Sequence, residues 1–179
     1  MFSILLLLTS LVFTSALPQV ASKDNLSEHT SKTIAWALGN GVDPSQLDPA
    51  GGGADGDLYV GRARIEGSWV PGKAFFRAGQ FMTAVAFEGE EIEVTDAQVL
   101  LRGGTRWAVE TNTRKIPASA VVIGTDPRTG EDTYACRGYV QESGDSYLLI
   151  GKVINGNIHC SLPHYGETVI YSFEVLVAI

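Results

Sequence analysis

Two Gly-Lys dipeptides occupy corresponding places in the chain, and each follows a segment that contains an aspartate. Gly72-Lys73 lies downstream of Asp55, and Gly151-Lys152 lies downstream of Asp126. A lysine ammonium offers three hydrogen-bond donors, whereas a carboxylate offers only acceptors. Two such groups at neighbouring turns can bracket adjacent hydroxyls of a sugar with strong, charge-assisted hydrogen bonds. This pattern predicts a metal-free carbohydrate site; the plainer alternative is that the lysines are solvated loop residues and Asp126 only begins a turn.

The surroundings of these residues recur in the same order with a period of roughly 75 residues, which is too long for a solenoid unit. Tyr59-Val60-Gly61-Arg62 returns as Tyr134-Ala135-Cys136-Arg137, and Trp36 returns as Trp107. Further repeated pairs are Phe87-Glu88-Gly89-Glu90 with Tyr165-Gly166-Glu167, and Gln98-Val99-Leu100-Leu101 with Glu174-Val175-Leu176-Val177. We therefore predict two related half-domains, a first repeat over residues 34–102 and a second repeat over residues 103–179. A site built from repeated residues then exists twice, which favours recognition over catalysis.

Short alternating apolar stretches predict strands, and no long segment carries a helical period. In Phe81–Phe87, for example, alternate residues define two faces that are both largely apolar. The fold class that follows is all-β, with two tandem pseudo-symmetric repeats of antiparallel strands forming one domain. The other predicted strands are 33–38, 58–65, 92–95, 97–101, 106–110, 133–140, 147–154, 157–162, 169–171 and 173–177.

Turn chemistry separates these strands. Asn155-Gly156 predicts a type I′ hairpin, because both central residues of that turn need positive φ. Asp126–Gly130 is typical of a turn in which proline sets φ and glycine ends the turn. Glu88-Gly89-Glu90 and His164-Tyr165-Gly166 are further turn candidates. The glycine-rich segment 51–56 predicts a mobile loop, since ordering so much glycine is costly.

The beginning of the chain predicts export. Residues 1–16 combine an apolar run that is short for a membrane span with a small-residue end, as in a signal peptide, although no Lys or Arg precedes the run. Residues 17–33 are polar and predict a flexible lead segment. Within this segment, Asn25 begins a glycosylation sequon. Without residues 1–16, roughly 160 residues remain, enough for one domain with a substantial core.

Two cysteines, Cys136 and Cys160, lie in the second repeat. In an oxidising compartment an even pair predicts a disulfide; two buried free thiols are the alternative. The net charge of −7 argues against a nucleic-acid partner, which needs a basic surface, and against anionic membrane surfaces.

Other chemistries are weakly represented. His159, Cys160 and His164 resemble fragments of a zinc site, but no second cysteine cluster supplies the remaining ligands. Glycoside hydrolysis needs two carboxyls at a defined separation, and the available glutamates are more typical of solvated turns; they are Glu88, Glu90, Glu91 and Glu167. No phosphate-binding glycine loop, nucleophile elbow or calcium loop is present in the sequence. We therefore expect a protein without catalytic activity, cofactor or metal.

The string from Leu58 to Gly67, continued by Val70-Pro71-Gly72-Lys73, resembles the DM-nine repeat family. In the second copy, Ile116–Ala120 followed by Gly124-Thr125-Asp126 resembles the opening of the repeat, and Phe173–Leu176 resembles its closing. The resemblance covers about residues 34–178. It implies an all-β fold of two repeats that binds mannose-type sugars without calcium.

The resemblance also assigns site residues. The sugar-contacting Asp and Lys of the family match Asp126 and Lys152 in the second repeat, and Lys73 matches in the first. The first-repeat Asp falls in the triple glycine 51–53, so Asp55 is a displaced substitute. Pro is missing before Gly151, and the family's G-K-E-H stretch is altered in both repeats.

The leading hypothesis from the sequence is a secreted lectin for mannose-like glycans, on microbial surfaces and in innate defence, whose two sites gain avidity through homodimerisation. The alternative is a structural or signalling protein whose sugar site has decayed. A pore-forming toxin is disfavoured because no length remains for a membrane-inserting module.

Overall fold

The structure is a computed structural model that describes residues 33–54, 56–109 and 115–179. The predicted signal peptide, almost all of the predicted lead segment, Asn25 and Asp55 lie outside these residues.

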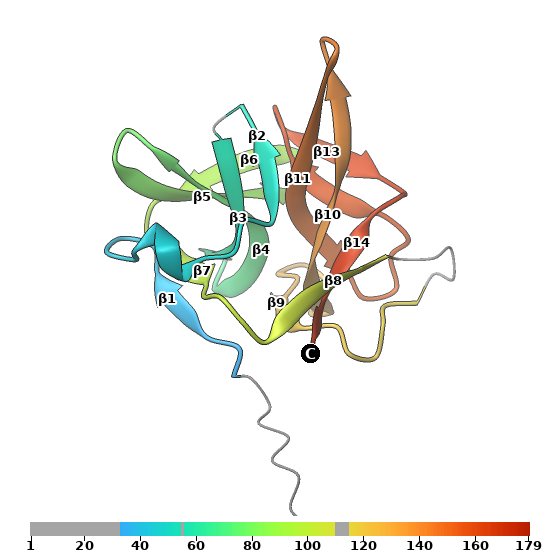
Figure 1. Ribbon diagram of the computed structural model, residues 1–179. Helices are drawn as coiled ribbons and strands as arrows, with labels where there is room; N and C mark the ends of the chain where they lie inside the picture. Colours follow the sequence, from blue (N-terminus) through green and yellow to red (C-terminus); the bar gives the residue numbers. More distant parts are fainter. Residues whose placement is uncertain (1–32, 55, 110–114) are drawn as a thin grey trace, which may run out of the picture. The chain divides into compact units, whose positions relative to one another are not determined.

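The described chain is built from strands, apart from one short 3-10 helix, which confirms the predicted all-β class (Figure 1). The first repeat contains β1 (Trp36–Leu38), η1 (Pro44–Gln46), β2 (Gly51–Gly53), β3 (Gly56–Ile65), β4 (Ser68–Arg77), β5 (Gln80–Phe87), β6 (Glu90–Val94) and β7 (Gln98–Leu100). The second repeat contains β8 (Thr105–Val109), β9 (Val122–Thr125), β10 (Asp132–Glu142), β11 (Asp145–Ile154), β12 (Cys160–Pro163), β13 (Glu167–Ile170) and β14 (Glu174–Ala178).

The two repeats pair their strands in the same way. β3 to β6 form an antiparallel meander, and β10 to β13 form its counterpart. β7 returns to pair with β3 and β1, just as β14 returns to pair with β10 and β8. The registers agree residue by residue: Gly61 faces Val99 where Cys136 faces Val175. The pseudo-symmetry predicted from the sequence is therefore present in the backbone.

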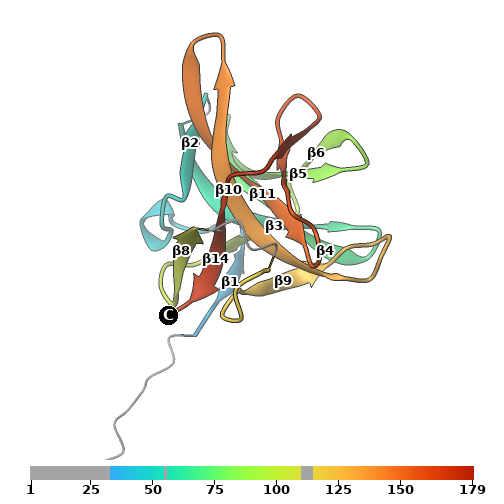
Figure 2. The same ribbon diagram turned by 90° about the vertical axis from the view of Figure 1, so that its right-hand side faces the viewer.

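The repeats are joined through β2 and β9, the strands that precede the meander in each repeat. β2 pairs with β3 on one side and, at Gly52, with Leu148 of β11 on the other. A Cβ on Gly51 would lie 2.2 Å from the Leu148 carbonyl oxygen, and a Cβ on Gly124 of β9 would lie 1.9 Å from that of Trp69. β2 and β9 thus each pack closely against the other repeat (Figure 2). The prediction of a mobile loop at 51–56 is wrong for β2, because these glycines permit close strand approach.

The Gly-Lys dipeptides lie inside strands and not at turns. Gly72 and Lys73 are central in β4, and Gly151 and Lys152 are central in β11. A Cβ on Gly72 would lie 2.0 Å from the Ala84 carbonyl oxygen, and a Cβ on Gly151 the same distance from that of Ser161. The prediction that these dipeptides form turns is wrong, since the glycines are required by tight packing and have no positive φ.

The tight hairpins use other residues. In five two-residue turns both φ values are positive, as a type I′ turn requires; they are Glu66-Gly67, Ala78-Gly79, Glu88-Gly89, Ser143-Gly144 and Tyr165-Gly166. The turns predicted around Gly89 and Gly166 are confirmed. The type I′ turn predicted at Asn155-Gly156 is wrong, because only Gly156 has a positive φ, and residues 155–159 form a longer connection between β11 and β12.

Two arginines at equivalent places fix each repeat to the other. Arg62 stacks on Trp36 at 4.2 Å and donates to Gln98 and to the Ile123 carbonyl oxygen of the second repeat. Arg137 stacks on Trp107 at 4.5 Å and donates to Glu174 and to the Ala50 carbonyl oxygen of the first repeat. Burial, followed by the charge of Arg64, lowers the pKa of Arg62 from its usual value. Repeated Trp, Arg and Gln/Glu positions in the sequence are therefore a structural latch between the repeats.

The main hydrophobic core draws on both repeats. Its fully buried members include Leu58 and Phe75 from the first repeat and Ile150 and Leu176 from the second. Because burial of each such side chain stabilises a fold by about 1.5–3 kcal/mol, this shared cluster stabilises the arrangement of the two halves.

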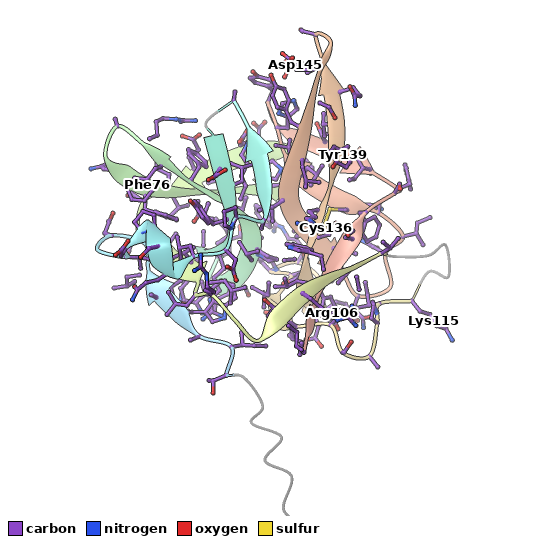
Figure 3. All side chains as sticks on the ribbon, in the orientation of Figure 1. Phe76, Arg106, Lys115, Cys136, Tyr139 and Asp145 are labelled. Atoms are coloured by element: carbon purple, nitrogen blue, oxygen red, sulfur yellow. A yellow bond between two sulfur atoms is a disulfide. The ribbon has the colours of Figure 1, made fainter. Side chains whose placement is uncertain are left out.

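The predicted disulfide between Cys136 and Cys160 is confirmed, and it joins β10 to β12. Figure 3 shows Cys136 low on β10, with Asp145 at the tip of the same hairpin. By register, the first repeat has Gly61 and Thr83 at these two places, and a Cβ on Gly61 would lie 2.6 Å from the Thr83 hydroxyl oxygen. The bridge therefore replaces a close glycine contact in one repeat only.

Candidate functional site

The second-repeat site is centred on Asp126 and Lys152, which the structure brings together as predicted. Asp126 directly follows β9, and Lys152 projects from the middle of β11. Lys152 Nζ lies 3.7 Å from Asp126 Oδ2, and both residues are only 5% exposed. Because both charged groups are largely withdrawn from water, their hydrogen bonds to a ligand would be stronger than the same bonds at an exposed surface.

The turn that follows β9 orients the Asp126 carboxylate. Its Oδ1 accepts hydrogen bonds from the backbone N–H groups of Arg128 and Thr129, both at 3.0 Å, and from the Thr129 hydroxyl at 3.3 Å. Gly130, with a φ of 74°, closes this predicted turn. One carboxylate oxygen is thus engaged by the turn, while the other faces the lysine.

The first repeat completes the second-repeat site. Lys152 Nζ lies 5.3 Å from the ring centroid of Phe87, the last residue of β5. On the exposed rim, Arg128 pairs with Glu88 and lies 3.7 Å from Glu66. The site therefore combines an ammonium, a carboxylate and an aromatic face under a charged rim.

The first-repeat site has different chemistry. Lys73 is again almost buried, but its Nζ pairs with Glu91 Oε1 at 2.8 Å. The strand register shows why the first repeat has no equivalent of Asp126. Thr125 faces Asp132 in the second repeat, and Gly52 faces Asp57 at the same place in the first. Asp126, which follows Thr125, therefore corresponds to Gly53, which follows Gly52. The predicted partner Asp55 lies outside the described residues, so the predicted pairing of Lys73 with Asp55 stays a prediction.

A cavity of about 340 Å³ opens beside Lys73. This volume falls in the range of roughly 300–1,000 Å³ that is usual for small-ligand sites. Its polar and aromatic lining consists of Lys73, Arg77, Glu91, Glu93, Glu142, Tyr147, His164 and Tyr165. We call this cavity the Lys73 pocket.

Two hairpins, one from each repeat, meet between the sites. Glu167 N donates to the Gly89 carbonyl oxygen, and Gly89 N donates to Glu167 Oε2, both at 2.9 Å. Tyr165 N donates to Glu91 Oε2 at 2.9 Å. The β5–β6 hairpin contributes Phe87 to the second-repeat site, and the β12–β13 hairpin contributes His164 and Tyr165 to the Lys73 pocket. Each site is therefore assembled from both repeats.

The β10–β11 hairpin explains a further difference between the sites. It is two residues longer on each arm than β3–β4: Tyr59 precedes the turn at Glu66, whereas its equivalent Tyr134 precedes the turn at Ser143. The extension projects beyond the neighbouring strands (Figure 1) and brings Glu142 and Tyr147 to the Lys73 pocket. Partial burial, then the charges of Asp145 and Glu142, raise the pKa of Tyr147, which favours the neutral phenol.

Several pocket residues were not predicted as ligand contacts. The sequence pattern relates Glu91 to glycoside hydrolysis and His164 to zinc, and it assigns no ligand contact to Glu142 or Tyr147. It also assigns none to Phe87 of the second-repeat site. The unequal spacing between the repeated Tyr and the Lys in the two halves was the available signal for the longer hairpin.

Within residues 33–54, 56–109 and 115–179, no group of three or more His, Cys, Asp or Glu side chains is placed to hold a metal ion. No helix in the same ranges is long and apolar enough to cross a membrane.

Fold and site together define an all-β tandem-repeat protein with two unequal lysine-centred sites. A family model for the DM9 repeat matches residues 54–177, and the chain therefore belongs to the DM9 repeat family. This confirms the resemblance seen in the sequence, and membership favours a lectin-like, carbohydrate-binding domain.

A solved structure has a similar fold. The crystal structure of the nematode sperm cell motility protein MFP2B matches with a TM-score of 0.57 at 16% identity, over 82% of this chain and 45% of that chain. The chain thus spans less than half the length of that protein, and the likeness concerns the fold alone. No curated protein matches the chain.

Proposed function

We propose that this protein is a secreted, non-enzymatic lectin that binds mannose-type glycans through its second-repeat site and without calcium. The observation that carries the proposal is the Asp126–Lys152 pair, whose charged atoms lie 3.7 Å apart in an almost buried position. At that separation the two groups are in ionic contact but not in hydrogen-bond contact, so each keeps capacity for a ligand.

The geometry suits two neighbouring hydroxyls of a monosaccharide. One hydroxyl donates to Asp126 Oδ2, and its neighbour accepts from Lys152 Nζ, which offers three protons. Phe87 is buried beside the ammonium and holds it in place through a cation–π contact. The site needs no metal, because protein groups supply both donor and acceptor.

The remaining parts of the proposal follow from the surroundings of the site. The Cys136–Cys160 disulfide is compatible with an oxidising, extracellular compartment. Absence of catalysis is supported by the glutamates beside the sites, since Glu88 pairs with Arg128 and Glu91 pairs with Lys73. Homodimerisation would raise the avidity of a single weak site by about 10²-fold or more on multivalent glycans such as those of microbial surfaces, as a role in innate defence requires.

A glycan array with the mature chain tests this proposal, using wild type beside Lys152→Ala, Asp126→Asn and Lys73→Ala. We expect mannose-type glycans to be captured by wild type and by Lys73→Ala, and to be lost from both second-repeat variants. The exposed Lys115→Ala is the control for loss of one positive charge. Capture that persists in Lys152→Ala and Asp126→Asn would refute the site, and release of hydrolysed glycan would refute the absence of catalysis.

The alternative is a non-catalytic structural or signalling protein with a decayed sugar site. Gly53 in place of the first-repeat aspartate, and the pairing of Lys73 with Glu91, favour it. A folded wild-type protein that captures no glycan on the array would support this alternative.

A further inference from the structure

The Lys73 pocket is not a second copy of the Asp126–Lys152 site. The position of Asp126 is taken by Gly53, which has no side chain, and Gly53 itself lines the pocket. Lys73 is already bound to Glu91 at 2.8 Å. A neutral diol would therefore meet an occupied ammonium and no equivalent carboxylate, so the pocket requires a ligand of another kind.

The charges that line the pocket are unequal. Glu91 is matched by Lys73, and Glu93 accepts two hydrogen bonds from Arg77 Nη1 at 2.8 and 2.9 Å. The third carboxylate, Glu142, has one ionic contact within the described chain, with His164 Nε2 at 3.2 Å. The lining thus has three carboxylates but only two side chains with a fixed positive charge, Lys73 and Arg77, which leaves negative charge in excess beside Glu142.

Aromatic groups lie around this carboxylate. Tyr165 and His164 have ring centroids 4.7 Å apart, and Tyr147 lies 6.3 Å from His164. Tyr165 is 82% exposed at the tip of its hairpin. Exposed aromatic rings beside a carboxylate are suited to a ligand that has both a ring-like apolar face and a positive charge.

The carboxylate and one of these rings come from the lengthened β10–β11 hairpin. The shorter β3–β4 hairpin gives the second-repeat site no equivalent, since Glu66 at its turn lies beside Arg128 on the rim. Glu142 and Tyr147 are therefore contributed to the Lys73 pocket and not to the second-repeat site.

We propose that the Lys73 pocket binds a cationic sugar, namely a hexosamine with a free protonated amine, through Glu142. The ammonium of the ligand pairs with the Glu142 carboxylate, and its ring lies against Tyr165 and Tyr147. This assignment rests on the proposed function in that it takes the domain to bind carbohydrate, but it concerns the other site and a different ligand class. The chain then binds two kinds of glycan, one neutral and one cationic, at two different sites.

The test titrates the mature chain at pH 7 by calorimetry and by amide NMR shifts with three trimers. Glucosamine trimer carries the amines, its N-acetylated form has the same skeleton without the charge, and mannotriose is the neutral ligand of the second site. Spermidine serves as a cation without a sugar ring. We expect glucosamine trimer to bind at least about tenfold more tightly than its acetylated form, because only the free amine can form a charge-assisted hydrogen bond with Glu142. We expect the same margin over spermidine, because only the trimer has a ring face to lie against Tyr165 and Tyr147.

Variants then locate the binding. Glu142→Gln keeps the shape of the side chain, and we expect it to weaken glucosamine trimer about tenfold while mannotriose is unchanged. Glu131→Gln is the matched control, since it removes the same charge from an exposed residue that does not line the pocket. Lys152→Ala should abolish mannotriose binding and leave glucosamine trimer unaffected.

The two proposals fail separately in this design. Equal binding of the glucosamine trimer and its acetylated form, equal weakening by Glu142→Gln and Glu131→Gln, or spermidine binding as tight as the trimer would overturn the Lys73-pocket proposal. A wild-type chain that does not bind mannotriose would instead overturn the proposed function of the second-repeat site.

Discussion

Replacing Gly151 by alanine tests the packing that places Lys152. A Cβ at this position would lie 2.0 Å from the Ser161 carbonyl oxygen and 2.9 Å from Leu162 Cα. Ordinary contacts of a Cβ begin at about 3.4 Å, so β12 would have to retreat from β11 by more than 1 Å. The obstructing atoms belong to the backbone and cannot rotate away.

Overpacking of this kind costs about 1–3 kcal/mol, and a clash between two backbones lies at the upper end. With an unfolding slope of about 2 kcal/mol/M in urea, a loss of about 3 kcal/mol lowers the unfolding midpoint by about 1.5 M. Lys152 follows Gly151 directly, so the same displacement should also weaken mannotriose binding.

Urea unfolding followed by tryptophan fluorescence, with the disulfide intact, measures the stability change. Gly72→Ala should cost about as much, because its Cβ would lie 2.0 Å from the Ala84 carbonyl oxygen. Gly52→Ala is the control: its nearest contact would be 4.0 Å away, and its free energy of unfolding should stay within about 0.5 kcal/mol of wild type. A Gly151→Ala protein as stable as wild type would refute the described contact between β11 and β12.

Three further predictions follow from the fold and the site. Replacing Cys136 and Cys160 by Gly and Thr, the residues at these places in the first repeat, should lower the free energy of unfolding by about 3.5 kcal/mol, because the bridge closes a loop with a sequence separation of 24; unchanged stability in urea would contradict this. Arg137→Lys should lower stability by about 2 kcal/mol, since lysine cannot keep the contacts to Glu174 and the Ala50 carbonyl oxygen while stacking on Trp107; an unaltered urea midpoint would argue against the latch. Adding EDTA should leave mannotriose affinity unchanged in calorimetry, and a loss restored by calcium would show that the site needs a metal.

Strand periodicity and repetition predicted the fold class because they report directly on burial and register. The turns were harder. Asn155-Gly156 has the ideal composition for a type I′ turn, yet the chain places its type I′ turns at pairs such as Ala78-Gly79 and Ser143-Gly144. Glycine alone does not distinguish a turn from a close approach between strands, which is why Gly51–Gly53 and Gly72 were misinterpreted.

The Asp126–Lys152 pair could be predicted because both residues match positions of the family's repeat motif. The Lys73 pocket could not, since its chemistry depends on which hairpin reaches over which site. Glu142 and His164 are 22 positions apart in the sequence, and only the folded arrangement of β10–β11 and β12–β13 brings their side chains to 3.2 Å.

The reciprocal contribution of hairpins has a consequence for how such a chain can originate and be divided. A single repeat expressed by itself would carry Lys73 without His164 and Tyr165, or Lys152 without Phe87. Neither fragment would possess a whole site, so ligand binding of this kind requires both repeats in one chain. When both repeats are present in one chain, the residues that each repeat contributes to the other's site can change independently of its own site. A change in one repeat then alters the ligand selectivity of the other.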